Sequence, residues 1–73
     1  MRYENREEYK MLGLKIGYYR KLAGLSQMEL AEKISISRTH MSRIENSDCA
    51  VSLDVVFEIA RTLDIPVARL FEF

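Results

Sequence analysis

The sequence predicts an all-α fold of five short helices. Apolar residues recur at spacings of three and four along the chain, the period of helices with one buried face. Serines precede several of these runs, and the only proline stands before the last. At 73 residues and 48% apolar composition, the chain suits one small domain, residues 1–73, with a polar N-terminal extension over residues 1–9.

The first helix is expected to begin near Arg6. Asn5 and Glu8 have the spacing of a capping box, and acidic residues in a first turn suit the positive end of the helix dipole. Gly24 supplies the left-handed residue that commonly follows a helix end. The apolar stripe between these signals consists of Leu12, Ile16, Tyr19 and Ala23.

Two further helices joined by a tight turn are expected over about residues 26–46. Ser26 and Glu29 form a capping box that opens the first of them. Its inner face consists of Leu30, Ala31 and Ile34. Ser37 is expected to cap the second, in which Met41 and Ile44 point inward.

The outward positions of that second helix are polar and basic: Arg38, Thr39, Ser42 and Arg43. An arginine can donate two hydrogen bonds to guanine O6 and N7, and a threonine can offer its hydroxyl to a base or its methyl to thymine. A short helix with this face suits insertion into the major groove of DNA.

The C-terminal third is expected to hold the last two helices. Ser52 is predicted to cap a helix with the core stripe Leu53, Val56, Ile59, Ala60 and Leu63. Pro66 is expected to start a last short helix, which turns inward Val67, Leu70 and Phe71. Three apolar residues remain outside this pattern and are predicted to form a homodimer seam: Val55, Phe57 and Phe73.

Charge is unevenly distributed, although the net charge is zero. Residues 1–46 carry nine Lys/Arg and six Asp/Glu, a balance of +3, whereas residues 47–73 carry two and five, a balance of −3. The basic part contains the predicted groove-binding helix, so the acidic part is expected to face away from DNA.

Other function classes lack support. The single His40 has no partners at metal-ligand spacing and no nucleophile to activate, so we expect no metal site, cofactor or enzymatic activity. The single Cys49 fits a reducing, cytoplasmic location. No apolar run approaches the roughly 18 residues of a membrane span, so no membrane partner is expected.

The residues at about 10–72 resemble the lambda-repressor-like helix-turn-helix family, also called the XRE family. The resemblance is carried by Leu25-Ser26-Gln27, the small Ala31, Ile36 in the turn, and Met41 with Ile44. The run Arg38-Thr39-His40-Met41-Ser42 is also similar to a pattern in restriction–modification controller proteins.

The resemblance implies roles for individual residues. The base-contacting positions are Arg38, Thr39 and Arg43. The phosphate-contacting positions that it implies are Gln27 and Asn46. We also expect phosphate contacts from Ser37, Ser42 and His40, with a packing role as the alternative for His40. Arg20 and Glu45 match a structural ion pair that braces the first helix, and Ser35 stands where the family prefers glycine with a positive φ.

The predicted function is sequence-specific transcriptional regulation through double-stranded DNA. A homodimer would bind a palindromic operator whose half-sites lie about 34–36 Å apart, or a multiple of that distance. The alternative is a protein-interaction module, such as an antitoxin or adaptor, with a protein partner in place of DNA. Neutral charge and Asp48 in the loop after the groove-binding helix favour this alternative.

Overall fold

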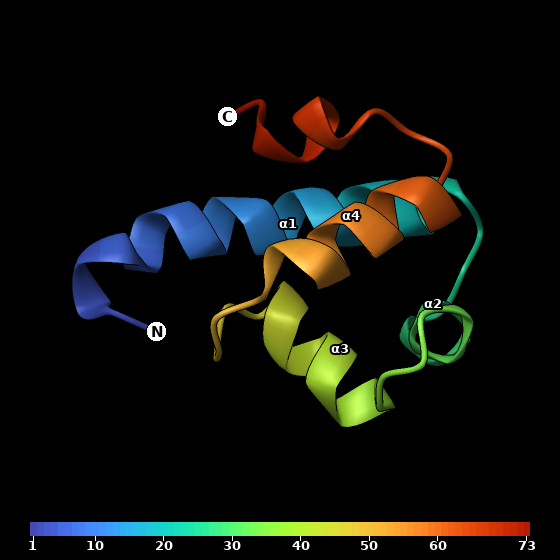
Figure 1. The fold of residues 1–73 in the computed structure, drawn as a ribbon, viewed down its shortest axis with the longest axis horizontal. Coiled ribbons are helices and arrows are strands. Elements are labelled where there is room, and N and C mark those ends of the chain that lie inside the picture. The colour runs from blue at the N-terminus through green and yellow to red at the C-terminus, as the bar shows by residue number, and fades with distance from the viewer.

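The longest helix, α1, crosses the whole molecule, and the other elements pack around it (Figure 1). The computed structural model describes all of residues 1–73. The helices are α1 (Arg6–Leu22), α2 (Gln27–Lys33), α3 (Arg38–Glu45) and α4 (Leu53–Thr62), with short 3₁₀ turns η1 (Tyr3–Asn5) and η2 (Val67–Phe71). Helices α2 and α3 lie on one side of α1, and η2 lies on the other. The molecule measures 31 × 24 × 19 Å.

The all-α prediction is confirmed, but there are four α-helices rather than five. The fifth predicted helix is the 3₁₀ turn η2. Pro66 precedes this turn with φ −61° and ψ 138°, an extended conformation, and no side chain caps the first N–H groups. A segment of five residues without a cap suits the 3₁₀ geometry, which proteins use in short pieces.

The start of α1 at Arg6 is as predicted, but the capping box at Asn5 is absent. Residues Tyr3–Asn5 form η1, and this turn gives Asn5 a φ of −97° and a ψ of 8°. An N-cap side chain needs an extended backbone to reach the N–H groups of the first turn. At the other end, Gly24 has the expected positive φ, 75°.

The three predicted serine caps are all present. In Ser26, Ser37 and Ser52 the hydroxyl oxygen accepts a hydrogen bond from the backbone N–H three residues later, at 3.0, 2.9 and 3.2 Å. Each serine has an extended backbone, the conformation of an N-cap. Local sequence therefore determines where α2, α3 and α4 begin.

The capping box of α2 is complete. The Ser26 backbone N–H donates to Glu29 Oε1 at 2.8 Å, and the Glu29 N–H donates to the Ser26 hydroxyl. The backbone hydrogen bond from Ser26, with a smaller contribution from its side chain, lowers the pKa of the Glu29 carboxyl below its usual value. The folded helix therefore favours the ionised form of the Glu29 carboxyl.

One core joins all four α-helices and η2. Its members are Leu12, Ile16, Leu30, Ala31, Ile34, Met41, Ile44, Val56, Ile59, Ala60, Leu63 and Leu70. The predicted inner faces of α2 and α3 are buried in full, so the apolar core holds α3 from its inner side. Burial of side chains such as these supplies most of the stability of a small helical domain.

Three predicted core residues are exposed. Ala23 is the C-cap of α1, where the chain turns away, and Leu53 is the first residue of α4, about one turn before the buried Val56. Phe71 is 45% exposed because η2 has about three residues per turn. That period places residues 67 and 70 on one side and residue 71 about a third of a turn away.

Candidate nucleic-acid interface

Helix α3 presents a polar face to solvent. Met41 and Ile44 are buried beneath it, with 0% and 3% of their surface exposed. On the outer side, the three residues predicted to contact bases are all exposed: Arg38, Thr39 and Arg43. Arg38 is the first residue of the helix, directly after its Ser37 cap. This end of α3 points away from α1 (Figure 1), so it is free to enter a groove.

A buried ion pair connects the other end of α3 to α1. Arg20 Nε donates to Glu45 Oε2 at 2.6 Å, and Arg20 Nη2 donates to Glu45 Oε1 at 3.0 Å. Both side chains are only 8% exposed. Arg20 Nη1 also donates to the Leu25 carbonyl at 2.8 Å, so one guanidinium joins α1, the loop after it, and α3.

Gln27 adds α2 to this network. Its Nε2 donates to Glu45 Oε1 at 3.1 Å, and the side chain is half-buried. The bond leaves the second amide hydrogen and the amide oxygen of Gln27 without a partner inside the protein. The structure thus brings together three of the residues predicted from the resemblance, Arg20, Gln27 and Glu45, and orients α3 relative to α1 and α2.

The other predicted phosphate contacts lie along α3. Ser37 accepts the His40 N–H, which leaves the Ser37 hydroxyl hydrogen available to an outside acceptor. Asn46 Nδ2 donates to Ser42 Oγ at 3.4 Å at the opposite end. Ser37 and Asn46 are exposed, whereas His40 and Ser42 are half-buried.

The predicted dimer residues lie outside this interface. Val55 is half-buried on α4, while Phe57 and Phe73 are 40% and 53% exposed. Next to Phe73, an apolar hollow of about 350 Å³ lies between the start of α1, the start of α4, and η2. Leu53 and Phe71 also line it, so the exposed apolar surface of this region is larger than the sequence indicated.

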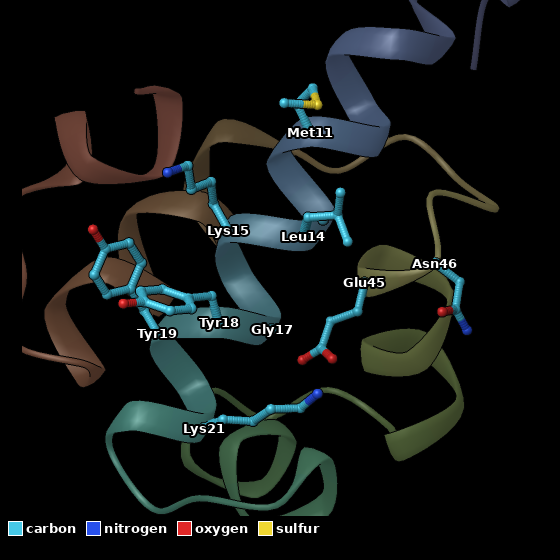
Figure 2. Close-up of a pocket in the computed structure, with 10 residues that line it drawn as sticks. Met11, Leu14, Lys15, Gly17, Tyr18, Tyr19, Lys21, Glu45 and Asn46 are labelled. Carbon is cyan, nitrogen blue, oxygen red and sulfur yellow. The ribbon is translucent and has the colours of Figure 1, made fainter. Parts of the chain in front are cut away.

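A second open groove, not predicted from the sequence, follows α1 (Figure 2). It measures about 680 Å³ and reaches Glu45 and Asn46 at the end of α3. Exposed apolar side chains line its α1 side: Met11, Leu14 and Tyr18. Their spacing of three and four residues is a helical stripe, which was the available signal.

No group of three or more His, Cys, Asp and Glu side chains is arranged to hold a metal ion. None of the helices combines the length and apolar character needed to cross a membrane.

Comparison with known proteins identifies relatives of this arrangement. Residues 16–70 match the family described as helix-turn-helix. The chain is 35% identical over 57 residues to an uncharacterized HTH-type transcriptional regulator of Methanocaldococcus jannaschii, covering 78% of this chain and 86% of that protein. It is also 35% identical over 63 residues to the HTH-type transcriptional regulator SinR of Bacillus subtilis, covering 85% of this chain but 57% of SinR.

Solved structures show the same fold. The restriction-modification controller protein C.AhdI from Aeromonas hydrophila superposes with a TM-score of 0.88 and 28% identity, covering 94% of this chain and all of that one. The biofilm regulator SinR, solved in complex with DNA, superposes with a TM-score of 0.76 and 34% identity, covering 84% of this chain and 98% of that one.

Proposed function

The chain belongs to the helix-turn-helix family, and on that premise we propose that it is a sequence-specific DNA-binding transcriptional regulator. The observation that carries the proposal is the outward face of α3, where Arg38, Thr39 and Arg43 are exposed at the free side of a helix anchored from within. The relatives are named transcriptional regulators, one of them solved with DNA, which supports a binding protein rather than an enzyme.

We assign base reading to these three residues. Arg38 and Arg43 each donate two hydrogen bonds to a guanine, and Thr39 contacts a base edge or a thymine methyl. The Arg20–Glu45 pair supports this role because it holds the C-terminal end of α3, opposite the free end, and so fixes the tilt of the helix. Fixed orientation matters, since bidentate contacts require the guanidinium plane to align with the base edge.

Phosphate contacts fix the register of α3 in the groove. We assign them to Gln27, Ser37, His40, Ser42 and Asn46. The free amide hydrogen of Gln27 and the free hydroxyl hydrogen of Ser37 support the assignment, because both are donors without a partner inside the protein.

The protein acts as a homodimer on a palindromic operator in the cytoplasm. The exposed Phe57 and Phe73 and the neighbouring apolar hollow support a dimer seam on the side of α4 and η2, together with Val55. The likeness to C.AhdI supports the resemblance to restriction–modification controllers. Half-sites would lie about 34–36 Å apart, or a multiple of that distance.

The test is binding to DNA from directly upstream of the protein's own gene, compared with a random-sequence duplex of equal length. In the Arg38→Ala/Arg43→Ala variant the preference for the upstream DNA should fall by at least about tenfold, because each bidentate contact contributes about 1–3 kcal/mol of discrimination. Arg61→Ala/Arg69→Ala is the matched control, since it removes two exposed arginines from the acidic part of the chain.

Circular dichroism establishes that both variants remain folded. Equal preference in the two variants would refute base reading by α3. Net neutrality and Asp48 after α3 favour a protein-interaction module as the second candidate. Failure of the unaltered protein to bind either duplex at low salt would favour that candidate instead.

A further inference from the structure

We propose that the side of α1 facing α3 is an additional DNA-binding surface, on which Arg6, Lys10 and Lys21 bind phosphates on both sides of the groove entered by α3. The inference rests on the proposed function and extends it to residues that neither the family resemblance nor the predicted site included. Arg6 and Lys10 lie outside the residues that match the family, 16–70.

Two glycines identify the side of α1 that faces α3. A Cβ atom on Gly13 would lie 2.5 Å from the Glu45 carbonyl oxygen and 2.8 Å from that of Ile44. A Cβ atom on Gly17 would lie 3.3 Å from Glu45 Oε1. The end of α3 therefore packs directly against the backbone of α1 on this side.

The three cations share this side of the helix. Arg6 and Lys10 precede Gly13 and Gly17 by seven residues each, and Lys21 follows Gly17 by four, spacings that keep residues on one helical face. All three cations are exposed. Arg6 and Lys10 thus extend past α3 on one side, and Lys21 extends past it on the other.

The surfaces next to these cations support this placement. Arg6 and Lys10 line a hollow with Asn46 and Ser47, just after α3. Figure 2 shows Lys21 extending from α1 towards the side where Glu45 lies. Lys15, from the same helix, points away from that side.

None of the three cations is neutralised within the protein. The ion pairs of the structure are Arg2–Glu4, Arg20–Glu45 and Arg69–Glu72. Glu7 and Asp48 line hollows shared with Arg6, but neither forms an ion pair with it. The carboxylate nearest the centre of the surface, Glu45, is buried and already bound to Arg20.

The dimensions place phosphates within reach of these side chains. Lys10 and Lys21 are eleven residues apart on α1, about 16 Å, which exceeds the groove width of about 12 Å. With α1 lying across the groove, these side chains reach the phosphates on its two sides.

This surface explains how a chain of zero net charge can bind DNA. Its free cations are concentrated around the base of α3, and they act on phosphates without regard to sequence.

The experiment measures the salt dependence of binding to a random-sequence duplex, because phosphate contacts do not need an operator. In Lys21→Gln the slope of log K against log salt should be smaller by about 0.9, the value for one lost phosphate contact. In Arg6→Gln/Lys10→Gln it should be smaller by about 1.8. Lys15→Gln is the matched control, with the same charge change on the same helix, and its slope should equal that of the unaltered protein.

Glutamine has nearly the helix propensity of lysine and arginine, so the variants should keep their thermal midpoints. If the unaltered protein binds and Lys21→Gln and Arg6→Gln/Lys10→Gln keep its slope, this inference is overturned while the proposed function stands. If the unaltered protein binds no DNA, both are overturned. A reduced slope in Lys15→Gln equal to that in Lys21→Gln would also overturn it, because the effect would follow net charge rather than position.

Discussion

The helix-turn-helix, residues 26–46, and the C-terminal region, residues 52–73, are similar in length but are held in place differently. In the first, serine caps begin both helices, and Glu45 accepts hydrogen bonds from Arg20 and Gln27. In the second, α4 has a serine cap, but η2 has none, and four large apolar side chains remain exposed: Leu53, Phe57, Phe71 and Phe73.

The difference teaches how the two regions serve the proposed function. Directional polar contacts give α3 a single orientation, which reading of base edges requires. The C-terminal region has excess apolar surface instead, which suits association with a second copy. Mutations should therefore separate the two: one region should be sensitive to lost polar contacts, and the other to lost apolar surface.

The largest effect is expected for Glu45→Ala. This variant leaves the buried Arg20 guanidinium without its carboxylate and should lower the free energy of unfolding by about 3–5 kcal/mol. Urea unfolding followed by circular dichroism measures the change.

Glu72→Ala, which breaks the Arg69–Glu72 pair of the C-terminal region at 3.9 Å, is the control. Since the side chains of Arg69 and Glu72 are both more than half exposed, the free energy of unfolding of Glu72→Ala should fall by less than about 1 kcal/mol. Equal losses in the two variants would contradict the comparison.

A smaller effect, on association rather than folding, is expected for Phe57→Ser. It removes an exposed aromatic ring from the proposed dimer seam and should weaken dimerisation by about tenfold or more, or about 1.4 kcal/mol. Sedimentation equilibrium measures the dimer dissociation constant. Tyr18→Ser, which removes an exposed aromatic ring from α1 outside the seam, should leave that constant unchanged. A weaker dimer in Tyr18→Ser alone would place the seam on α1.

The same contrast explains what could be predicted from the sequence. The starts of α2, α3 and α4 were predictable because a serine cap acts within three residues of its own position. The inner faces of α2 and α3 were predictable because each is covered by the rest of the fold along its whole length. Leu53 was assigned wrongly because burial at the start of a helix depends on which segment lies beside it. Phe71 was assigned wrongly because an α-helical period was expected where the chain forms a 3₁₀ turn.

The residues of the candidate site also divide into those that could be predicted from the sequence and those that could not. The exposure of Arg38, Thr39 and Arg43 followed from the helical period around Met41 and Ile44. The cations of α1 were not assigned to DNA, because their position relative to α3 depends on the packing of two helices. Gly13 and Gly17 were the available signal, since paired glycines four residues apart allow another element to approach the backbone closely.

The smallest effect is expected in the turn between α2 and α3. Ser35 has a φ of 60°, a left-handed conformation that is unfavourable for residues other than glycine by about 1–2 kcal/mol. Ser35→Gly removes this strain but increases the entropy of the unfolded chain, so the net gain in the free energy of unfolding should be about 0.5–1 kcal/mol.

Asp64, after α4, has nearly the same φ, 57°, but aspartate adopts this conformation more readily. Asp64→Gly should therefore give a smaller gain. Urea unfolding measures both variants: a shift of the midpoint with an unchanged dependence of the unfolding free energy on urea reports the change in stability. The Ser35 side chain is exposed and forms no hydrogen bond, so a loss of stability in Ser35→Gly would show that backbone strain does not limit this turn.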